Sequence, residues 1–140
     1  MARPTTKQPN ELVYDSGASI AAERDDRRFW AIHARALQRG VRPIVPAPCV
    51  VEVWRGSRQR SLDRVLEHCE IEHCEIEHLD ADRAKLAGAL RRGVSSDAGP
   101  VDAVVVEVAL RRRGAVVTAD RSAIARLASA SRRRIDIIDV

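Results

Sequence analysis

The fold is decided by residues 100–120, which read PVDAVVVEVALRRRGAVVTAD. Pro100 suits the first turn of a helix, where no amide hydrogen is needed, and Gly114 ends that helix after Arg113. The next residues, Ala115–Thr118, form a short apolar run without polar alternation, which predicts a strand covered on both faces. Such strands, when they alternate with helices, are typical of a parallel sheet between two layers of helices.

The rest of the chain continues this alternation of strands and helices. Most predicted helices begin at a capping aspartate or a proline, and most end before a glycine. After the first strand, Asp15 and the small residues that follow it predict a polar turn. The predicted strands span residues 12–14, 43–45, 115–118 and 135–138. The predicted helices span residues 25 or 26 to 40, 49–56, 57–68, 80–93, 100–113 and 121–131.

The composition favours a single compact domain. Of the 140 residues, 45% are hydrophobic and 31% are charged, so we expect one domain over residues 11–140 after a disordered lead-in at residues 1–10. The formal net charge of +4 is a mild bias toward polyanions. Aromatic residues make up only 3%, which argues against a surface that binds RNA by stacking bases on a row of rings.

Membrane insertion and export are not expected from this sequence. No apolar run approaches the roughly 18 residues that span a bilayer, and the N-terminus lacks the apolar core of a secretory signal. The three cysteines, Cys49, Cys69 and Cys74, are an odd number, which favours reduced thiols in the cytoplasm.

Residues 67–78 contain a tandem pentapeptide, EHCEI-EHCEI, followed by EH. Neither a helix nor a strand brings its three histidines together, because a five-residue step turns a helix by about 500° and reverses the face of a strand. The pairs Cys69–His73 and Cys74–His78 each supply two ligands, where a structural zinc ion needs four. We therefore interpret the repeat as a duplication that lengthens a helix end or bulges a strand, with its glutamates in solvent. Zinc binding by the repeat is the alternative.

Four acids that are scattered in sequence share a similar predicted position. Asp15 and Asp120 follow predicted strands, and Asp102 and Glu52 lie near the starts of predicted helices, all at the carboxyl edge of a parallel sheet. Carboxylates brought together raise one another's pKa unless a cation compensates, and Mg²⁺ or Mn²⁺ is the hard cation that prefers oxygen ligands. Taken singly, each acid is also typical of a cap, a turn or a solvated helix face.

Four segments resemble, in order, the motifs of PIN-domain nucleases, specifically the VapC-type toxins of toxin–antitoxin pairs. They are residues 13–21, 46–56, 101–103 and 117–120, whose acids are separated by 37, 50 and 18 residues. No single motif is specific, but their order and separations are. The resemblance covers nearly all of the chain from Leu12 onward.

The resemblance implies a three-layer α/β/α PIN fold and a Mg²⁺- or Mn²⁺-dependent endoribonuclease that forms a homodimer and is inhibited by a VapB-like antitoxin. Asp15, Glu52, Asp102 and Asp120 match the metal-binding acids of the family, and Ser16 and Thr118 match the hydroxyls that orient them. The chain departs from the family at three places. Gly17 replaces a usual Ser or Asn, Ser19 replaces a usual aliphatic residue, and the repeat lengthens a shorter segment.

The mechanism implied is hydrolysis of an RNA phosphodiester. A metal held by Asp15, Asp102 and Asp120, with Glu52 bound directly or through water, would activate a water molecule and neutralise developing charge. Arg24, Arg55 and Arg58 are candidate phosphate contacts, although exposed arginines are commonly only solvated. Two other functions stay open beside zinc binding: a non-catalytic interaction protein of the same fold, and a nuclease that acts on DNA.

Overall fold

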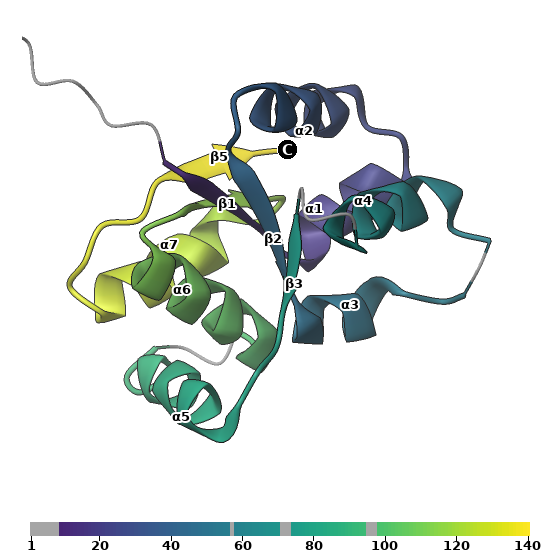
Figure 1. The fold of residues 1–140 in the computed structure, drawn as a ribbon. Helices are drawn as coiled ribbons and strands as arrows, with labels where there is room; N and C mark the ends of the chain where they lie inside the picture. The colour runs from purple at the N-terminus through teal and green to yellow at the C-terminus, as the bar shows by residue number, and fades with distance from the viewer. Residues whose placement is uncertain (1–8, 57, 71–73, 95–97) are drawn as a thin grey trace, which may run out of the picture.

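The computed structural model describes residues 9–56, 58–70, 74–94 and 98–140, without the side chains of residues 68–70 (Figure 1). Five strands form one sheet in this described part of the chain, with the order β3-β2-β1-β4-β5. Every neighbouring pair of strands is parallel. The strands are β1 (Glu11–Tyr14), β2 (Arg42–Pro46), β3 (Glu75–Glu77), β4 (Ala115–Thr118) and β5 (Ile137–Asp139).

Helices cover both faces of this sheet. Because parallel crossovers are right-handed, the helices between β1 and β3 lie on one face and those between β3 and β5 on the other (Figure 1). The first group is α1 (Ser16–Glu23), α2 (Arg27–Gln38), α3 (Ala47–Val53) and α4 (Arg60–Glu70). The second group is α5 (Ala81–Leu90), α6 (Pro100–Arg112) and α7 (Arg121–Ala130). The predicted three-layer α/β/α fold with a central parallel sheet is confirmed.

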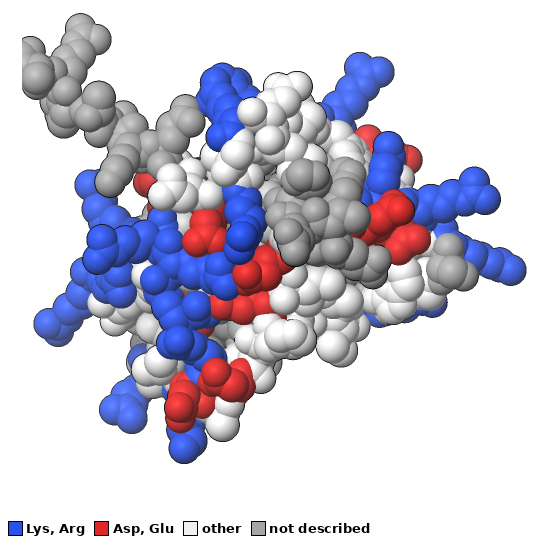
Figure 2. Space-filling view, in the orientation of Figure 1, with Lys and Arg blue, Asp and Glu red and all other residues white. Residues whose placement is uncertain are grey.

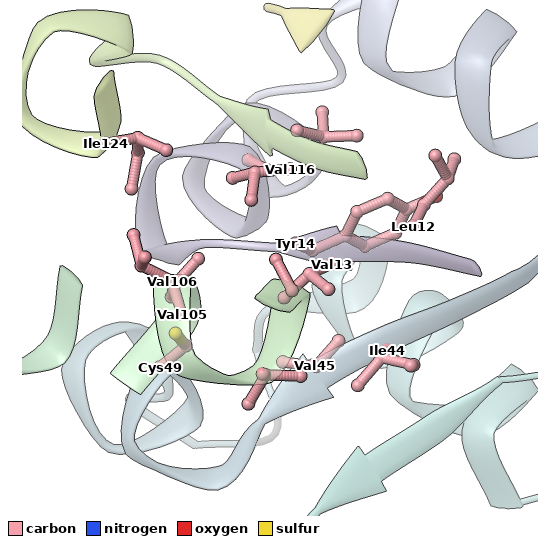
Figure 3. Packing of buried hydrophobic residues seen from close by; sticks show 14 of the residues in the cluster. Leu12, Val13, Tyr14, Ile44, Val45, Cys49, Val105, Val106, Val116 and Ile124 are labelled. Carbon is pink, nitrogen blue, oxygen red and sulfur yellow. The ribbon is translucent and has the colours of Figure 1, made fainter. Parts of the chain in front are cut away.

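The core fills the space between the sheet and the two helical layers (Figure 3). Val13, Val116 and Val117 have no exposed surface, as expected for central strands covered on both faces. Helix α6 is buried along most of its length, from Ala103 to Ala109. It packs against β1, β2 and β4, so it forms the centre of its layer.

Helix α1 corrects the predicted polar turn after the first strand. Its small residues carry little apolar periodicity, and serine and glycine have low helix propensity. The helix forms because Asp15 caps it, with Oδ1 accepting a hydrogen bond from the Ala18 amide at 2.8 Å. Ala18, Ser19 and Ala22 are buried, so tertiary packing supplies what the local propensity lacks.

The two helices after β2 are separated by a longer non-helical segment than predicted. Helix α3 ends at Val53 and α4 begins at Arg60. Gly56 lies between them with a φ of +119°, a conformation that other residues rarely adopt. Glu52 therefore lies in the last turn of α3, and its predicted place near a helix start is wrong.

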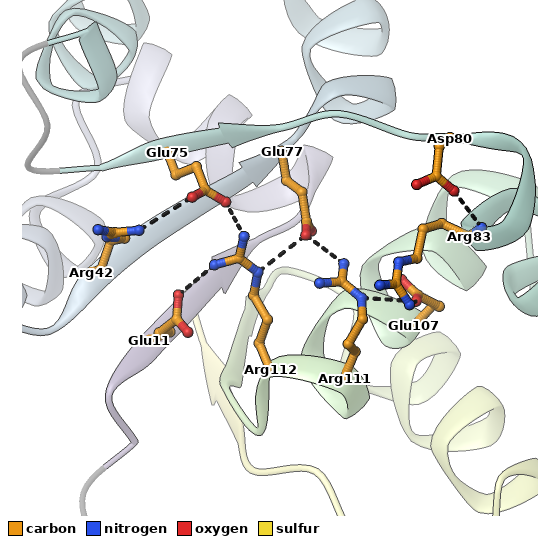
Figure 4. Close-up of polar contacts among 9 residues, drawn as sticks. All are labelled: Glu11, Arg42, Glu75, Glu77, Asp80, Arg83, Glu107, Arg111 and Arg112. Atoms are coloured by element: carbon orange, nitrogen blue, oxygen red, sulfur yellow. Dashed lines mark hydrogen bonds and ion pairs between the residues drawn. The ribbon is translucent and has the colours of Figure 1, made fainter.

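The last two residues of the second copy of the repeat form β3 together with Glu77, which follows them. The prediction that the glutamates of this segment lie in solvent is wrong for Glu75 and Glu77. Both belong to a network that joins β3 to the end of α6 (Figure 4). The repeat residues 71–73 lie outside the described residues, as do residues 1–8 of the predicted lead-in. The Cys69–His73 pair is therefore not described, and His78 is exposed.

We call this set of contacts the Glu–Arg network. Arg112 contacts Glu11 at 2.8 Å, Glu77 at 3.1 Å and also Glu75. Arg111 contacts Glu77 and, at 3.1 Å, Glu107. Arg42 adds a contact with Glu75 at 3.2 Å, and Arg83 approaches Glu107. The network fixes the edge strand β3 to β1 and α6.

The search for membrane-spanning segments was negative. In the described ranges, every helix is too short or too polar to cross a bilayer.

Candidate active site

The strand order places the ends of β1 and β4 at a special position. The chain leaves β1 toward one edge of the sheet and reaches β4 from the other direction, so these neighbours form the topological switch point. Ligands of open α/β sheets bind beyond the carboxyl ends of such strands. Asp15 follows β1 directly, while Thr118 ends β4 and Asp120 comes two residues later. The amide of Asp15 donates to the Val117 carbonyl at 3.2 Å and joins the two strand ends.

Asp15 is a buried carboxylate, with 4% of its surface exposed. Burial raises its pKa above the ordinary value, and the nearby charge of Asp102 adds to this effect. Hydrogen bonds from the Thr118 hydroxyl and the Ala18 amide oppose the rise because they favour the charged form. Thr118 therefore touches the carboxylate that it was predicted to orient.

Asp102 is half-buried in the first turn of α6. Its pKa is raised first by burial and then by the charges of Asp120 and Glu52. A hydrogen bond to the backbone of Gly99 opposes this rise. Asp102 thus interacts electrostatically with all three of the other predicted acids: Asp15 after β1, Glu52 in α3 and Asp120 before α7.

Glu52 and Asp120 are exposed at the rim of this group. Ser16 Oγ donates to Glu52 Oε1 at 2.5 Å, so this predicted supporting hydroxyl contacts its acid. Asp120 caps α7, with Oδ1 accepting from the Ala123 amide at 3.3 Å. The Asp120 amide donates to Thr118 Oγ1 at 2.9 Å. The two hydroxyls therefore link the rim acids to the ends of β1 and β4.

The four acids fit a hard divalent cation by chemistry. All their donors are carboxylate oxygens, and among the described residues none of the four is ion-paired with Lys or Arg. Burial is the main cause of the raised pKa of Asp15 and Asp102, and repulsion from the other acids adds to it. No three His, Cys, Asp or Glu side chains of the described segments already stand as a ligand set.

Cys49 is a neighbour of the acids that sequence reasoning missed. Its free thiol is fully buried in the first turn of α3 (Figure 3). Burial raises the pKa of its thiol to about 12, and the charges of Asp15, Glu52 and Asp102 contribute. The thiol stays protonated at neutral pH and is therefore no nucleophile. Nothing in the sequence pattern distinguished it from an ordinary core cysteine.

The three predicted phosphate-binding arginines are exposed: Arg24, Arg55 and Arg58. Arg24 caps α1, and Arg55 Nη1 donates to the Trp54 carbonyl at 3.0 Å. Within the described residues, none of them forms an ion pair with the four acids. Their contact with phosphate stays a prediction.

Two residues that depart from the family pattern have structural explanations. Ser19 is buried, and its Oγ donates to the Asp15 carbonyl at 3.2 Å, so its polar group is satisfied. A Cβ at Gly17 would lie 2.8 Å from Ala119 Cβ and 3.3 Å from Asp15 Oδ1. Gly17 thus lets the start of α1 approach the loop after β4, where Asp15 and Asp120 lie.

We expect Gly17→Ala to destabilise the protein by about 1–2 kcal/mol, since overpacking outweighs the better helix propensity of alanine. Chemical denaturation measures this change. The double variant Gly17→Ala/Ala119→Gly is expected to recover part of the loss, because it removes the Cβ–Cβ overlap. Gly88→Ala, where a Cβ meets nothing within 4 Å, is the matched control and should be neutral or stabilising. Equal effects of Gly17→Ala and Gly88→Ala would contradict this explanation.

The raised pKa of Asp15 predicts the sign of a pH effect in the presence of EDTA. The folded state binds more protons than the unfolded state between the ordinary value of 3.8 and the raised pKa, so the contribution of Asp15 to stability falls as pH rises through this window. The difference in the free energy of unfolding between the wild type and Asp15→Asn, measured by denaturation at several acidic pH values, should show this slope. Asp139→Asn is the control with opposite sign, because Arg121 lowers the pKa of Asp139. A flat difference for Asp15→Asn would show that burial does not penalise its charge.

Comparisons with known proteins agree with this geometry. The family model described as PIN domain matches residues 12–130. The structure of FitAcB from Neisseria gonorrhoeae is similar with a TM-score of 0.59 and 13% identity, over 91% of this chain and 96% of that one. PAE2754 from Pyrobaculum aerophilum is similar with a TM-score of 0.55 and 19% identity, over 98% and 93%. A search of the curated proteins found no match.

Proposed function

Because the chain belongs to the PIN domain family, we propose that it is a divalent-cation-dependent nuclease that hydrolyses RNA. PIN domains are typically metal-dependent nucleases. The observation that carries the proposal is the electrostatic coupling of Asp102 to Asp15, Glu52 and Asp120 at the switch point of the sheet. We assign the nuclease unit to residues 11–140.

The chain's own residues would position the reaction. Asp15, Asp102 and Asp120 would hold Mg²⁺ or Mn²⁺, with Glu52 bound directly or through water. When bound, the cation supplies an activated water molecule and neutralises charge that develops on the phosphate. Thr118 and the Ala18 amide hold the Asp15 carboxylate in place, and Ser16 holds Glu52. The N-terminus of α6 favours negative charge at Asp102.

Substrate and partners are proposed from the resemblance to VapC-type toxins. RNA is the proposed substrate, with Arg24, Arg55 and Arg58 as phosphate contacts. A VapB-like antitoxin is the proposed inhibitor, the active form is proposed to be a homodimer, and the site of action is the cytoplasm. A small neighbouring gene that encodes a DNA-binding N-terminus and a flexible tail would support the antitoxin.

A cleavage assay with matched substrates tests the proposal. Protein purified under denaturing conditions and refolded, and so freed of any bound partner, is incubated with labelled RNA and with DNA of the same sequence, in Mg²⁺, Mn²⁺ or EDTA. We expect RNA to be cut only with a divalent cation. Cleavage of DNA instead would identify a DNA nuclease. A refolded protein that cuts neither polymer would favour the non-catalytic interaction protein.

A further inference from the structure

Two arginine triplets lie side by side at the ends of two helices. Arg111–Arg113 end α6, and Arg132–Arg134 follow α7. Arg113, Arg133 and Arg134 line one hollow of about 330 Å³, together with the backbone around Gly114. We call these three side chains the arginine hollow. Figure 2 shows Lys and Arg gathered on the side of the molecule where α6 and α7 end.

The positive charge of the arginine hollow is not neutralised by ion pairs with the described residues. In the neighbouring Glu–Arg network, Arg111 and Arg112 are neutralised by glutamates. By contrast, the three hollow arginines are exposed and, among the described residues, have no carboxylate within ion-pair distance. The Arg133 guanidinium donates to the Leu110 carbonyl at 3.1 Å, which leaves its charge without a carboxylate among the described residues. Asp136 is the one acid in the lining of the hollow, so the hollow keeps a net positive charge.

The backbone conformation of Arg113 is a second observation at the hollow. Arg113 ends α6 with a φ of 54°, in the left-handed conformation that glycine adopts with less strain. Arg132, which precedes the other two hollow arginines, has a φ of 59°. Cations favour helix C-termini, but Arg111 and Arg112 already occupy the last turn of α6. An additional arginine at a glycine-favouring position is therefore better explained by a ligand than by helix stability.

Helix α6 connects the arginine hollow to the acidic site. Asp102 lies in its first turn and Arg113 at its end, which at 1.5 Å per residue corresponds to about 16 Å along the helix axis. In a stacked helical strand each phosphate advances about 3.4 Å along the axis, so at least about five nucleotides are needed to span this distance over the surface. A polynucleotide engaged at the acids can thus reach the hollow.

We propose that the arginine hollow binds the phosphate backbone of the RNA strand whose other part lies at the acidic site. This inference rests on the proposed function and adds a length requirement to it. RNA longer than about five nucleotides gains contacts at the hollow, while shorter RNA does not. The recognition is of phosphate charge, so it carries no base sequence.

Binding measurements test this length requirement. Fluorescence anisotropy is measured in Mg²⁺ with non-cleaving Asp102→Asn protein and labelled RNAs of about four and about twelve nucleotides. The double variant Arg113→Gly/Arg134→Gln is expected to lose affinity for the longer RNA only. The salt dependence should also differ. Between 50 and 200 mM salt, the affinity for the longer RNA should fall about sevenfold more for the protein that keeps both arginines than for the double variant, because the variant has lost two phosphate contacts. The melting temperature should stay unchanged or rise, since glycine relieves the strain at position 113.

The double variant Arg27→Gln/Arg39→Gln removes the same charge from α2 and is the matched control. The inference is overturned if both double variants weaken binding of the longer RNA equally, if neither does, or if no RNA binds. It is also overturned if labelled polyglutamate binds at the hollow and RNA does not, because the hollow would then fit an acidic protein segment. RNA that binds with the expected length dependence but is never cut by the wild type would contradict the proposed nuclease alone.

Discussion

Replacing Asp102 with asparagine is expected to reduce cation-dependent RNA cleavage by at least about a hundredfold, because the carboxylate that couples to the other three acids is lost. The same substitution should raise the melting temperature in EDTA. Burial and the charges of Asp120 and Glu52 oppose ionisation of Asp102, so a neutral side chain removes an unfavourable charge from the folded state. Cleavage of labelled RNA and thermal unfolding of the same preparation measure both effects.

The chain offers a matched control for this experiment. Asp82 is an exposed aspartate in the first turn of α5, as Asp102 is in the first turn of α6. Asp82→Asn should leave both cleavage and stability near their wild-type values. Full cleavage by purified Asp102→Asn protein would sink the assignment of the site. Loss of cleavage together with a lower melting temperature would attribute the effect to folding instead.

Replacing Arg112 with glutamine is expected to destabilise the protein by about 2–4 kcal/mol, which lowers the melting temperature by roughly 10 °C. Arg112 is the common partner of Glu11, Glu75 and Glu77, and its side chain is only 19% exposed. Among the described residues, Glu77 Oε2 already lacks a hydrogen-bond partner, so removing the guanidinium leaves further negative charge poorly compensated. Thermal and urea denaturation measure the loss.

An exposed ion pair provides the comparison. Arg121 contacts Asp139 at 3.0 Å with about half of each side chain exposed, so Arg121→Gln should leave the stability close to that of the wild type. Adding Glu75→Gln and Glu77→Gln to Arg112→Gln should recover part of the stability, since it removes charges left without a cation. An Arg112→Gln protein as stable as the Arg121→Gln protein would show that the Glu–Arg network holds β3 only weakly.

The parts of the fold that the sequence predicted well are those with strong local signals. Strand β4 spans Ala115–Thr118 as predicted, because its apolar run is bounded by Gly114 and Asp120. Helix α2 matches its cap at Asp26, and α6 matches its proline start. The four acids were singled out because Asp15 and Asp120 follow predicted strands, and Glu52 and Asp102 were placed near the starts of predicted helices.

The parts that were missed depend on contacts between distant residues. Helix α1 is stabilised by burial against other elements, which its small residues do not reveal. Glu75 and Glu77 read as solvated charges because their partner Arg112 is more than thirty positions away. The role of Gly17 depended on Ala119. The environment of Cys49 depended on Asp15 and Asp102, which come from two other segments, as well as on Glu52 of its own helix. Periodicity describes a segment and its neighbours, so it cannot supply such pairings.

The position of β3 in the second copy of the repeat has a genetic consequence. Both copies are identical, so loss of either one by replication slippage gives the same shorter gene product. In that product the triplet Glu-Ile-Glu still precedes His78, Leu79 and the Asp80 cap of α5. The residues removed come from the end of α4 and the connection before β3. A chain that has lost one copy therefore still carries the two glutamates of β3 that bind Arg111 and Arg112.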